Sequence, residues 1–145
     1  METKLQKIVY CMDRWMWLRE QGITITDYCK EHKAESISVY GYGRLGKHLV
    51  WELQNEGFQI PWIMDQRSMD IDVDHNKYEL ILPHEVNRVK DADMIIVTAV
   101  EDYYDIEAEL SKYTKAEIIS IERIIKFFHL CGCNMARSGN KATEI

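Results

Sequence analysis

The sequence predicts an α/β fold with a doubly wound, parallel, five-stranded sheet and an N-terminal α-helical hairpin. Two observations support it: short apolar runs alternate with amphipathic helical segments from residue 36 onward, and a glycine-rich turn follows the first apolar run. Strands that alternate with helices usually form a parallel sheet through right-handed crossovers. A doubly wound sheet that starts at the first strand has the order 3-2-1-4-5. Its ligand crevice opens between strands one and four.

Residues 1–35 are predicted to form the helical hairpin. A first helix ends at Gly22, and Thr26 resembles the N-cap of a short second helix that runs to about His32. The first helix is apolar around much of its circumference, so it should pack on two surfaces. Its apolar residues at helical spacing are Leu5, Ile8, Met12, Trp15 and Met16.

Residues 36–133 are predicted to form the sheet domain, and residues 134–145 a flexible tail. The helix after the first strand carries an inward leucine stripe and ends at Gly57. The expected strands are residues 37–40, 60–64, 78–82, 94–99 and 118–121. Further helices are expected at about residues 84–89, at 103–113 and from 124 to near 132.

The glycine turn has the spacing Gly41-x-Gly43-x-x-Gly46, and Asp65 ends the second apolar run nineteen residues later. That order is the fingerprint of a dinucleotide-binding βαβ unit. Gly41 permits the tight turn, Gly43 lets backbone amides approach a pyrophosphate, and Gly46 lets the helix lie close to the sheet. The phosphates would then lie at the N-terminus of a helix.

Three segments supply the predicted nucleotide-binding residues: the turn, the end of strand two and the end of strand four. Arg44 could reach a phosphate, stack on an adenine or remain solvated. Asp65 either binds the ribose hydroxyls or simply ends a strand. Its charge favours NAD over NADP, although the neighbouring Arg67 leaves NADP open. The complete set is Gly41, Tyr42, Gly43, Arg44, Leu45, Gly46, Asp65, Gln66, Thr98 and Ala99.

Two other interpretations of the glycine turn remain. The turn could help the sheet pack without binding any ligand. Gly41, Gly46 and Lys47 also match most of a phosphate-binding loop of ATPases, but His48 stands where that loop requires Ser or Thr to hold magnesium. The extra Gly43 and the position of Asp65 favour the dinucleotide interpretation.

No metal site is predicted. The aspartates at 70, 72 and 74 lack the glycine and the glutamate of a calcium loop. His129, Cys131 and Cys133 match no common zinc spacing and have no second ligand pair. His84 begins a short helix, where a surface or capping role is favoured over a place at the crevice.

Composition excludes several function classes. The net charge of −6 and the lack of a Lys/Arg cluster argue against nucleic acid as a partner. No apolar stretch is long enough to span a membrane. The four cysteines form no regular framework, and no signal-peptide pattern precedes them, so reduced thiols and a cytoplasmic location are expected.

Catalytic motifs are also missing from the sequence. None of the eight tyrosines has a lysine four residues later, and no Gly-x-Ser-x-Gly or zinc-protease motif occurs. Enzymatic activity is therefore left open, with binding favoured. An NAD-dependent oxidoreductase or an epimerase-like enzyme is the form that activity would take.

The chain resembles the small NAD(P)-binding Rossmann-like domains of bacterial surface-polysaccharide and sugar-modifying proteins. The segments that carry the resemblance are SVYGYGRLGKHLVWEL, IPWIMDQ and MIIVTAVEDYYDIEAEL. The resemblance implies that the glycine turn holds phosphates and that Asp65 holds the ribose. It leads us to expect an accessory or sensor subunit in carbohydrate metabolism that binds NAD or a nucleotide-sugar, alone or beside a partner enzyme.

An interaction module is the alternative hypothesis. In this interpretation the fold has lost its ligand and the tryptophan-rich first helix, with Trp15 and Trp17, joins two copies in a homodimer. Trp51 lies on the outer side of its helix. It would be covered either by the N-terminal hairpin or by the second copy.

Overall fold

The computed structural model describes residues 2–65 and 77–131. The predictions for Gln66, Arg67, the aspartates at 70–74, Cys133 and residues 134–145 lie outside these ranges.

A five-stranded, all-parallel sheet forms the centre of the molecule, and its order β3-β2-β1-β4-β5 confirms the predicted topology. In register, Tyr40 pairs with Met64 and Val97, and Val97 pairs with Ser120. The carboxyl ends of the strands therefore meet at one edge of the sheet. The strands are β1 (Ile37–Tyr40), β2 (Ile63–Met64), β3 (Leu80–Ile81), β4 (Met94–Val97) and β5 (Glu117–Ser120).

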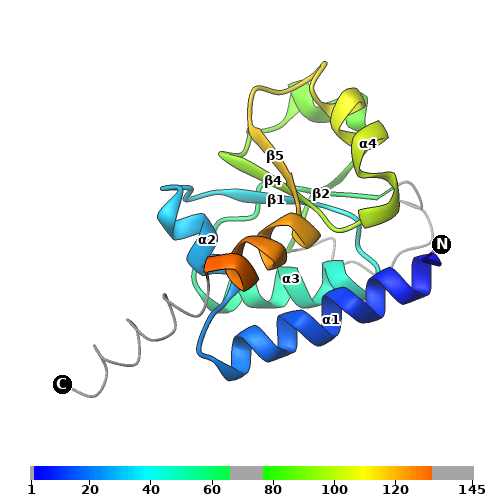
Figure 1. Cartoon of the computed structure of the whole chain (residues 1–145). Coiled ribbons are helices and arrows are strands. Elements are labelled where there is room, and N and C mark those ends of the chain that lie inside the picture. The colour runs from blue at the N-terminus through cyan, green and yellow to red at the C-terminus, as the bar shows by residue number, and fades with distance from the viewer. Residues whose placement is uncertain (1, 66–76, 132–145) are drawn as a thin grey trace.

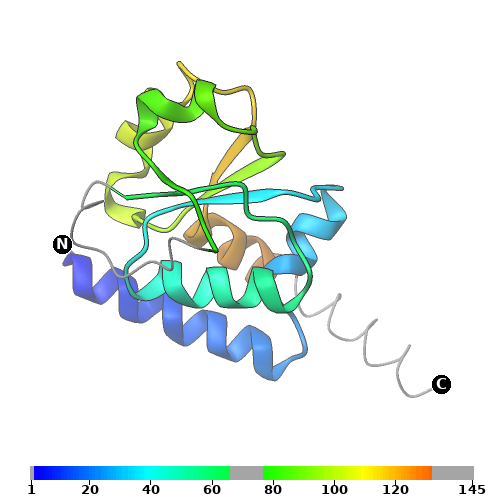
Figure 2. The ribbon, with the colours of Figure 1, turned by 180° about the vertical axis from the view of Figure 1, so that it is seen from behind.

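Helices cover both faces of this sheet (Figure 1). One face carries α3 (Arg44–Asn55), a helix of residues 121–131 and the N-terminal helices α1 (Lys4–Glu20) and α2 (Ile25–Glu31). The other face carries the short helix η1 (Pro83–Arg88) and α4 (Tyr103–Leu110), which follows the single turn η2 (Val100–Asp102). Figure 2 shows α1 running beside α3, with both helices starting near the same edge of the sheet.

Several element boundaries differ from the predictions. β2 and β3 are only two residues long, and Gln59 pairs with Ser36 in an isolated bridge before β2 begins. The N-cap of α2 is Thr24 instead of Thr26: the Thr24 hydroxyl accepts from the Asp27 N–H, and the Asp27 carboxylate accepts from the Thr24 N–H. This reciprocal capping box satisfies two backbone donors that Thr26 could not serve.

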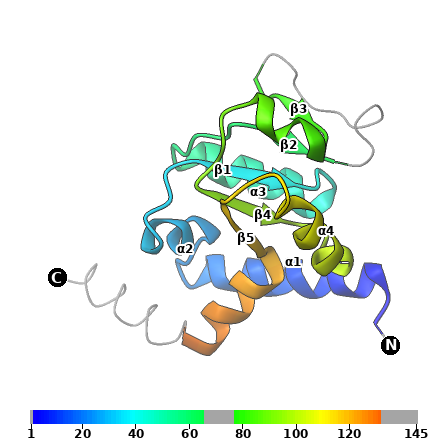
Figure 3. The ribbon, with the colours of Figure 1, turned by 90° about the horizontal axis from the view of Figure 1, so that it is seen from above.

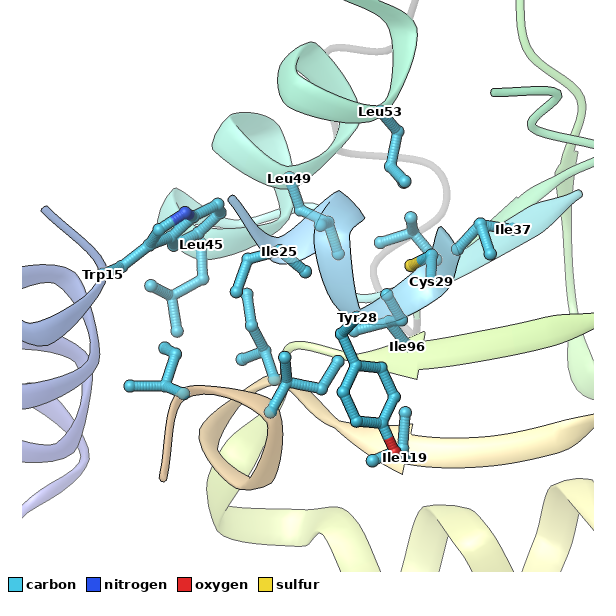
Figure 4. Packing of buried hydrophobic residues seen from close by; sticks show 14 of the residues in the cluster. Trp15, Ile25, Tyr28, Cys29, Ile37, Leu45, Leu49, Leu53, Ile96 and Ile119 are labelled. Carbon is cyan, nitrogen blue, oxygen red and sulfur yellow. The ribbon is translucent and has the colours of Figure 1, made fainter. Parts of the chain in front are cut away.

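Two hydrophobic clusters, one on each face of the sheet, form the core. The larger cluster joins α1, α2 and α3 to the inner side chains of the strands, as Figure 4 shows for Trp15, Ile25, Leu49 and Ile96. Residues 1–35 thus share one core with the sheet, so the position of α1 is fixed by packing against it.

A buried carboxylate links the three helices of that face. Glu52 on α3 is only 2% exposed, and its oxygens lie 2.8 Å from the Ile25 N–H and 3.4 Å from the Trp15 indole nitrogen. The guanidinium of Arg19 lies 3.6 Å away at the surface. Burial raises the pKa of Glu52 above its ordinary value of 4.5, and the hydrogen bond from Ile25 opposes that rise.

Within the described ranges, every helix falls short of the length and apolar character needed to cross a membrane.

Candidate functional site

The glycine turn joins the end of β1 to the start of α3. Its first residue, Gly41, has a φ of +101°, a conformation that L side chains rarely adopt. The Gly41 N–H donates to the Met64 carbonyl at 2.7 Å, which ties the turn to β2. A Cβ on Gly46 would collide with the carbonyl oxygen of Gly41, so the helix approaches the turn at a distance that only glycine allows.

Thr98 holds the turn from the β4 side. Its hydroxyl lies 2.9 Å from the Gly41 carbonyl and 3.1 Å from the Tyr40 carbonyl, in donor geometry toward both. A Cβ on Gly41 would also overlap this hydroxyl. The hydroxyl proton of Thr98 is therefore committed to the turn, and the residue positions the site through the backbone.

Asp65 holds the turn from the β2 side. Its Oδ2 accepts the N–H of Tyr42 at 2.8 Å, and the residue is 5% exposed. The carboxylate therefore has a structural contact that the sequence pattern did not predict.

The first turn of α3 begins without a side-chain cap, because its N-cap is Gly43. The first N–H groups of a helix have no intrahelical acceptor, and they give that end a partial positive charge. Arg44 is exposed at the same end and adds a full charge. This end of α3 is therefore suited to an anion.

A cavity of about 350 Å³ opens at this point. It lies where the strand order reverses, between the carboxyl ends of β1 and β4, which is the usual ligand position in doubly wound sheets. Figure 3 shows that the first turn of α1 lies beside the start of α4, on the far side of the glycine turn. The lining residues are Lys4, Ile8, Tyr40, Gly41, Gly43, Arg44, Leu45, Asp65, Thr98, Ala99, Asp102 and Ile106.

The structure brings most of the predicted site residues to this cavity. Seven line it: Gly41, Gly43, Arg44, Leu45, Asp65, Thr98 and Ala99. Tyr42 and Gly46 are not among the lining residues. Tyr42 donates its N–H to Asp65, and Gly46 provides the close approach of helix and turn. Gln66 lies outside the described residues.

Five more residues line the cavity. Asp102 belongs to the segment that leaves β4, whereas sequence reasoning missed Lys4 and Ile8 on α1, Tyr40 on β1 and Ile106 on α4. The sequence pattern predicts Tyr40 only as the end of a strand and Ile106 only as part of an amphipathic helix. Lys4 and Ile8 could not be assigned to the site, because the packing of α1 against η2 cannot be predicted from residues that are close in sequence.

The other candidate residues lie apart from the cavity. His84 is exposed on η1, and the described residues contain no cluster of three or more metal-ligating side chains. The imidazole of His129 stacks on Trp17 with 4.8 Å between ring centroids. Burial raises the pKa of the Cys11 thiol to about 11 and that of the Cys29 thiol to about 12, so both thiols remain protonated and unreactive at neutral pH.

Tyr103, which could have served as an acid at the crevice, is engaged elsewhere. Its hydroxyl lies 2.6 Å from a Glu107 carboxylate oxygen and 2.9 Å from the Ile118 carbonyl. Burial, followed by the hydrogen bond to Glu107, raises the pKa of the phenol above its ordinary value. Proton donation from this group to a ligand is therefore disfavoured.

The three tryptophans considered for an interface have different environments. Trp15 is buried, whereas Trp17 is 37% exposed and stacks on His129. Trp51 is 56% exposed, and the guanidinium of Arg19 lies 5.5 Å from its ring centroid. The N-terminal helices therefore leave about half of Trp51 uncovered.

Neither the models of known protein families nor the curated protein sequences give a match to this chain.

Proposed function

We propose that this chain is a nucleotide-binding protein that holds the phosphates of its ligand at the start of α3. The observation that carries the proposal is the cavity of about 350 Å³ at the strand-order reversal, lined by Gly43, Arg44 and Leu45. A phosphate group suits this position for two reasons. Backbone amides at the start of α3 are available as donors, and the Arg44 guanidinium lies at the same end of the helix.

Asp65 supports the nucleotide interpretation from the β2 side of the turn. Hydroxyl groups of a ribose donate hydrogen bonds, and a carboxylate at the end of the second strand is placed to accept them. Because the Tyr42 N–H already fixes this carboxylate, its orientation does not have to become ordered when a ribose binds beside it. NAD and nucleotide-sugars both carry the phosphate and ribose groups that this arrangement suits.

The proposed role is binding and not catalysis. The Tyr103 hydroxyl is hydrogen-bonded to Glu107 and Ile118, so it does not supply an acid to the cavity. The buried thiols of Cys11 and Cys29 are protonated, so they do not supply a nucleophile. An accessory or sensor subunit in carbohydrate metabolism is the role that the resemblance of the glycine-turn segments supports.

Calorimetric titration with ADP, NAD and UDP-glucose tests the proposal. Arg44→Ala is expected to weaken binding of the preferred nucleotide about tenfold, because it removes a charge-assisted contact to phosphate.

Asp65→Asn keeps an acceptor for the Tyr42 N–H but removes the carboxylate charge. It should therefore lower the affinity for ribose-containing ligands and leave the affinity for inorganic phosphate unchanged. Arg14→Ala, an exposed arginine of α1 outside the cavity, is the matched control and should have no effect. Failure of the wild-type protein to bind any nucleotide refutes the proposal.

A homodimer is the second candidate function, and one feature of α1 favours it. Leu5, Val9 and Met16 are 55%, 56% and 64% exposed, and with Met12 they recur at intervals of four, three and four residues. That spacing matches the seam of a coiled coil. The contact surface would then be this stripe and not Trp15, which is buried.

Light scattering tests the homodimer. The wild-type protein should have the mass of two chains, and Val9→Lys combined with Met16→Lys should return it to one, because lysines in the stripe would carry charge into the contact. Tyr104→Lys changes a large side chain on α4 that is 82% exposed, and it should leave the mass unchanged. A wild-type monomer at high concentration excludes this candidate.

A further inference from the structure

The wall of the cavity opposite the glycine turn is built by α1. Lys4 and Ile8, one turn apart on this helix, line the cavity together with Ile106. The start of α1 is fixed by a capping box, in which the Thr3 hydroxyl accepts from the Gln6 N–H at 3.1 Å and the Gln6 side chain accepts from the Thr3 N–H at 2.7 Å. Buried Cys11, Trp15 and Leu18 anchor the rest of the helix in the core.

This wall stands where half of a dinucleotide would lie. In a doubly wound sheet, a dinucleotide lies across the strand-order reversal, with one nucleotide on each side. The side that follows β4 is bounded here by Ala99, Asp102 and Ile106, and Lys4 and Ile8 line the same cavity from α1, which packs against η2. The cavity volume of about 350 Å³ is near the lower end of the range for small-molecule sites, about 300–1,000 Å³.

Resting on the proposed function, we infer that the ligand is a mononucleotide with a terminal phosphate, such as a nucleoside diphosphate, and that Lys4 and Arg44 bind that phosphate from opposite sides. A terminal phosphate carries more negative charge than a bridging diester, so it benefits more from two cations. The second nucleoside of NAD, or the sugar of a nucleotide-sugar, would have to displace Ile8 and the first turn of α1.

The cavity lining carries two cations, Lys4 and Arg44, and two carboxylates, Asp65 and Asp102. Lys4 and Arg44 are both exposed in the cavity lining, and the start of α3 adds its partial positive charge. Asp102 is the exposed carboxylate on the same rim and opposes an anion. Lys4 offsets that carboxylate, so its removal should weaken phosphate binding more than removal of a distant lysine.

Two matched pairs of ligands test the inference by calorimetry: ADP against NAD, and UDP against UDP-glucose. Within each pair the base is the same, and only the group beyond the terminal phosphate differs. We expect the diphosphate of the pair that binds to have an affinity at least tenfold higher than its extended partner. Lys4→Ala should reduce the affinity for that diphosphate about tenfold, whereas Lys7→Ala, one turn along α1 and outside the lining, should leave it unchanged.

The outcomes separate this inference from the function on which it depends. If NAD or UDP-glucose binds as tightly as its diphosphate, or if Lys4→Ala binds like the wild type, the inference is wrong and nucleotide binding stands. If the folded wild-type protein binds none of the four ligands, both are wrong. Rising salt should reduce the affinity for the diphosphate and narrow the difference between Lys4→Ala and the wild type.

Discussion

Gly46→Ala is expected to lower the free energy of unfolding by about 3 kcal/mol, the upper part of the range for overpacking a tight interior site. The added Cβ would overlap the Gly41 carbonyl oxygen, a backbone atom that cannot rotate away. Alanine in a helix ordinarily stabilises by about 1 kcal/mol relative to glycine, so a loss at this position must come from the collision. Urea denaturation measures it.

Gly57→Ala is the control for this substitution. Unlike Gly46, Gly57 has a positive φ, +81°, and nothing lies within 4 Å of the position that a Cβ would take. Gly57→Ala should therefore lower the free energy of unfolding by only about 1 kcal/mol, the cost of placing alanine in the left-handed conformation. The Gly46 variant should also lose nucleotide binding, because relief of the collision moves the turn away from α3. A Gly46 variant as stable as the wild type would contradict the close approach described above.

Glu52→Ala is expected to cost about 4 kcal/mol of stability, because it leaves the Ile25 N–H and the Trp15 indole N–H buried without their acceptor, at about 1–3 kcal/mol each, and opens a cavity. Glu52→Gln keeps one oxygen acceptor and should fall between alanine and the wild type. Chemical denaturation of the three proteins at neutral pH gives the order, and equal stability of alanine and wild type would contradict the linking role of Glu52.

We also expect the contribution of Glu52 to the free energy of unfolding to depend on pH. Because burial raises its pKa above 4.5 in the folded state, the folded protein binds the proton more tightly than the unfolded chain. The contribution of Glu52 to stability is therefore greatest below pH 4.5 and declines as the pH rises through the folded-state pKa. The stability of the wild type relative to Glu52→Gln should fall over that interval; a difference that is constant with pH would contradict the raised pKa.

Local sequence signals predicted the fold because each strand and helix carries its own periodicity. The glycine turn was predictable for the same reason: its three glycines and Asp65 all belong to one β1-α3-β2 unit. The cap of α2 was also readable from the Thr24-x-x-Asp27 spacing, although Thr26 was chosen instead. Such features depend on residues close in sequence.

The cavity could be predicted only in part, because its far wall depends on long-range packing. Lys4 and Arg44 are forty residues apart, and they meet at one cavity only because α1 packs beside α3. The hydrogen bond between Asp65 and the Tyr42 N–H could not be predicted from the sequence either. The spacing between the glycine turn and Asp65 is the same whether the carboxylate faces a ribose or a backbone amide. Tertiary packing decides both.

Backbone amide chemical shifts recorded during titration with ADP, UDP, NAD and UDP-glucose locate the nucleotide on the protein. We expect a bound nucleotide to shift the amides of Gly43, Arg44 and Leu45 most strongly, with smaller changes at Lys4 and Ala99. Unchanged amides at the start of α3 with all four ligands, or shifts centred on another surface, would contradict this expectation.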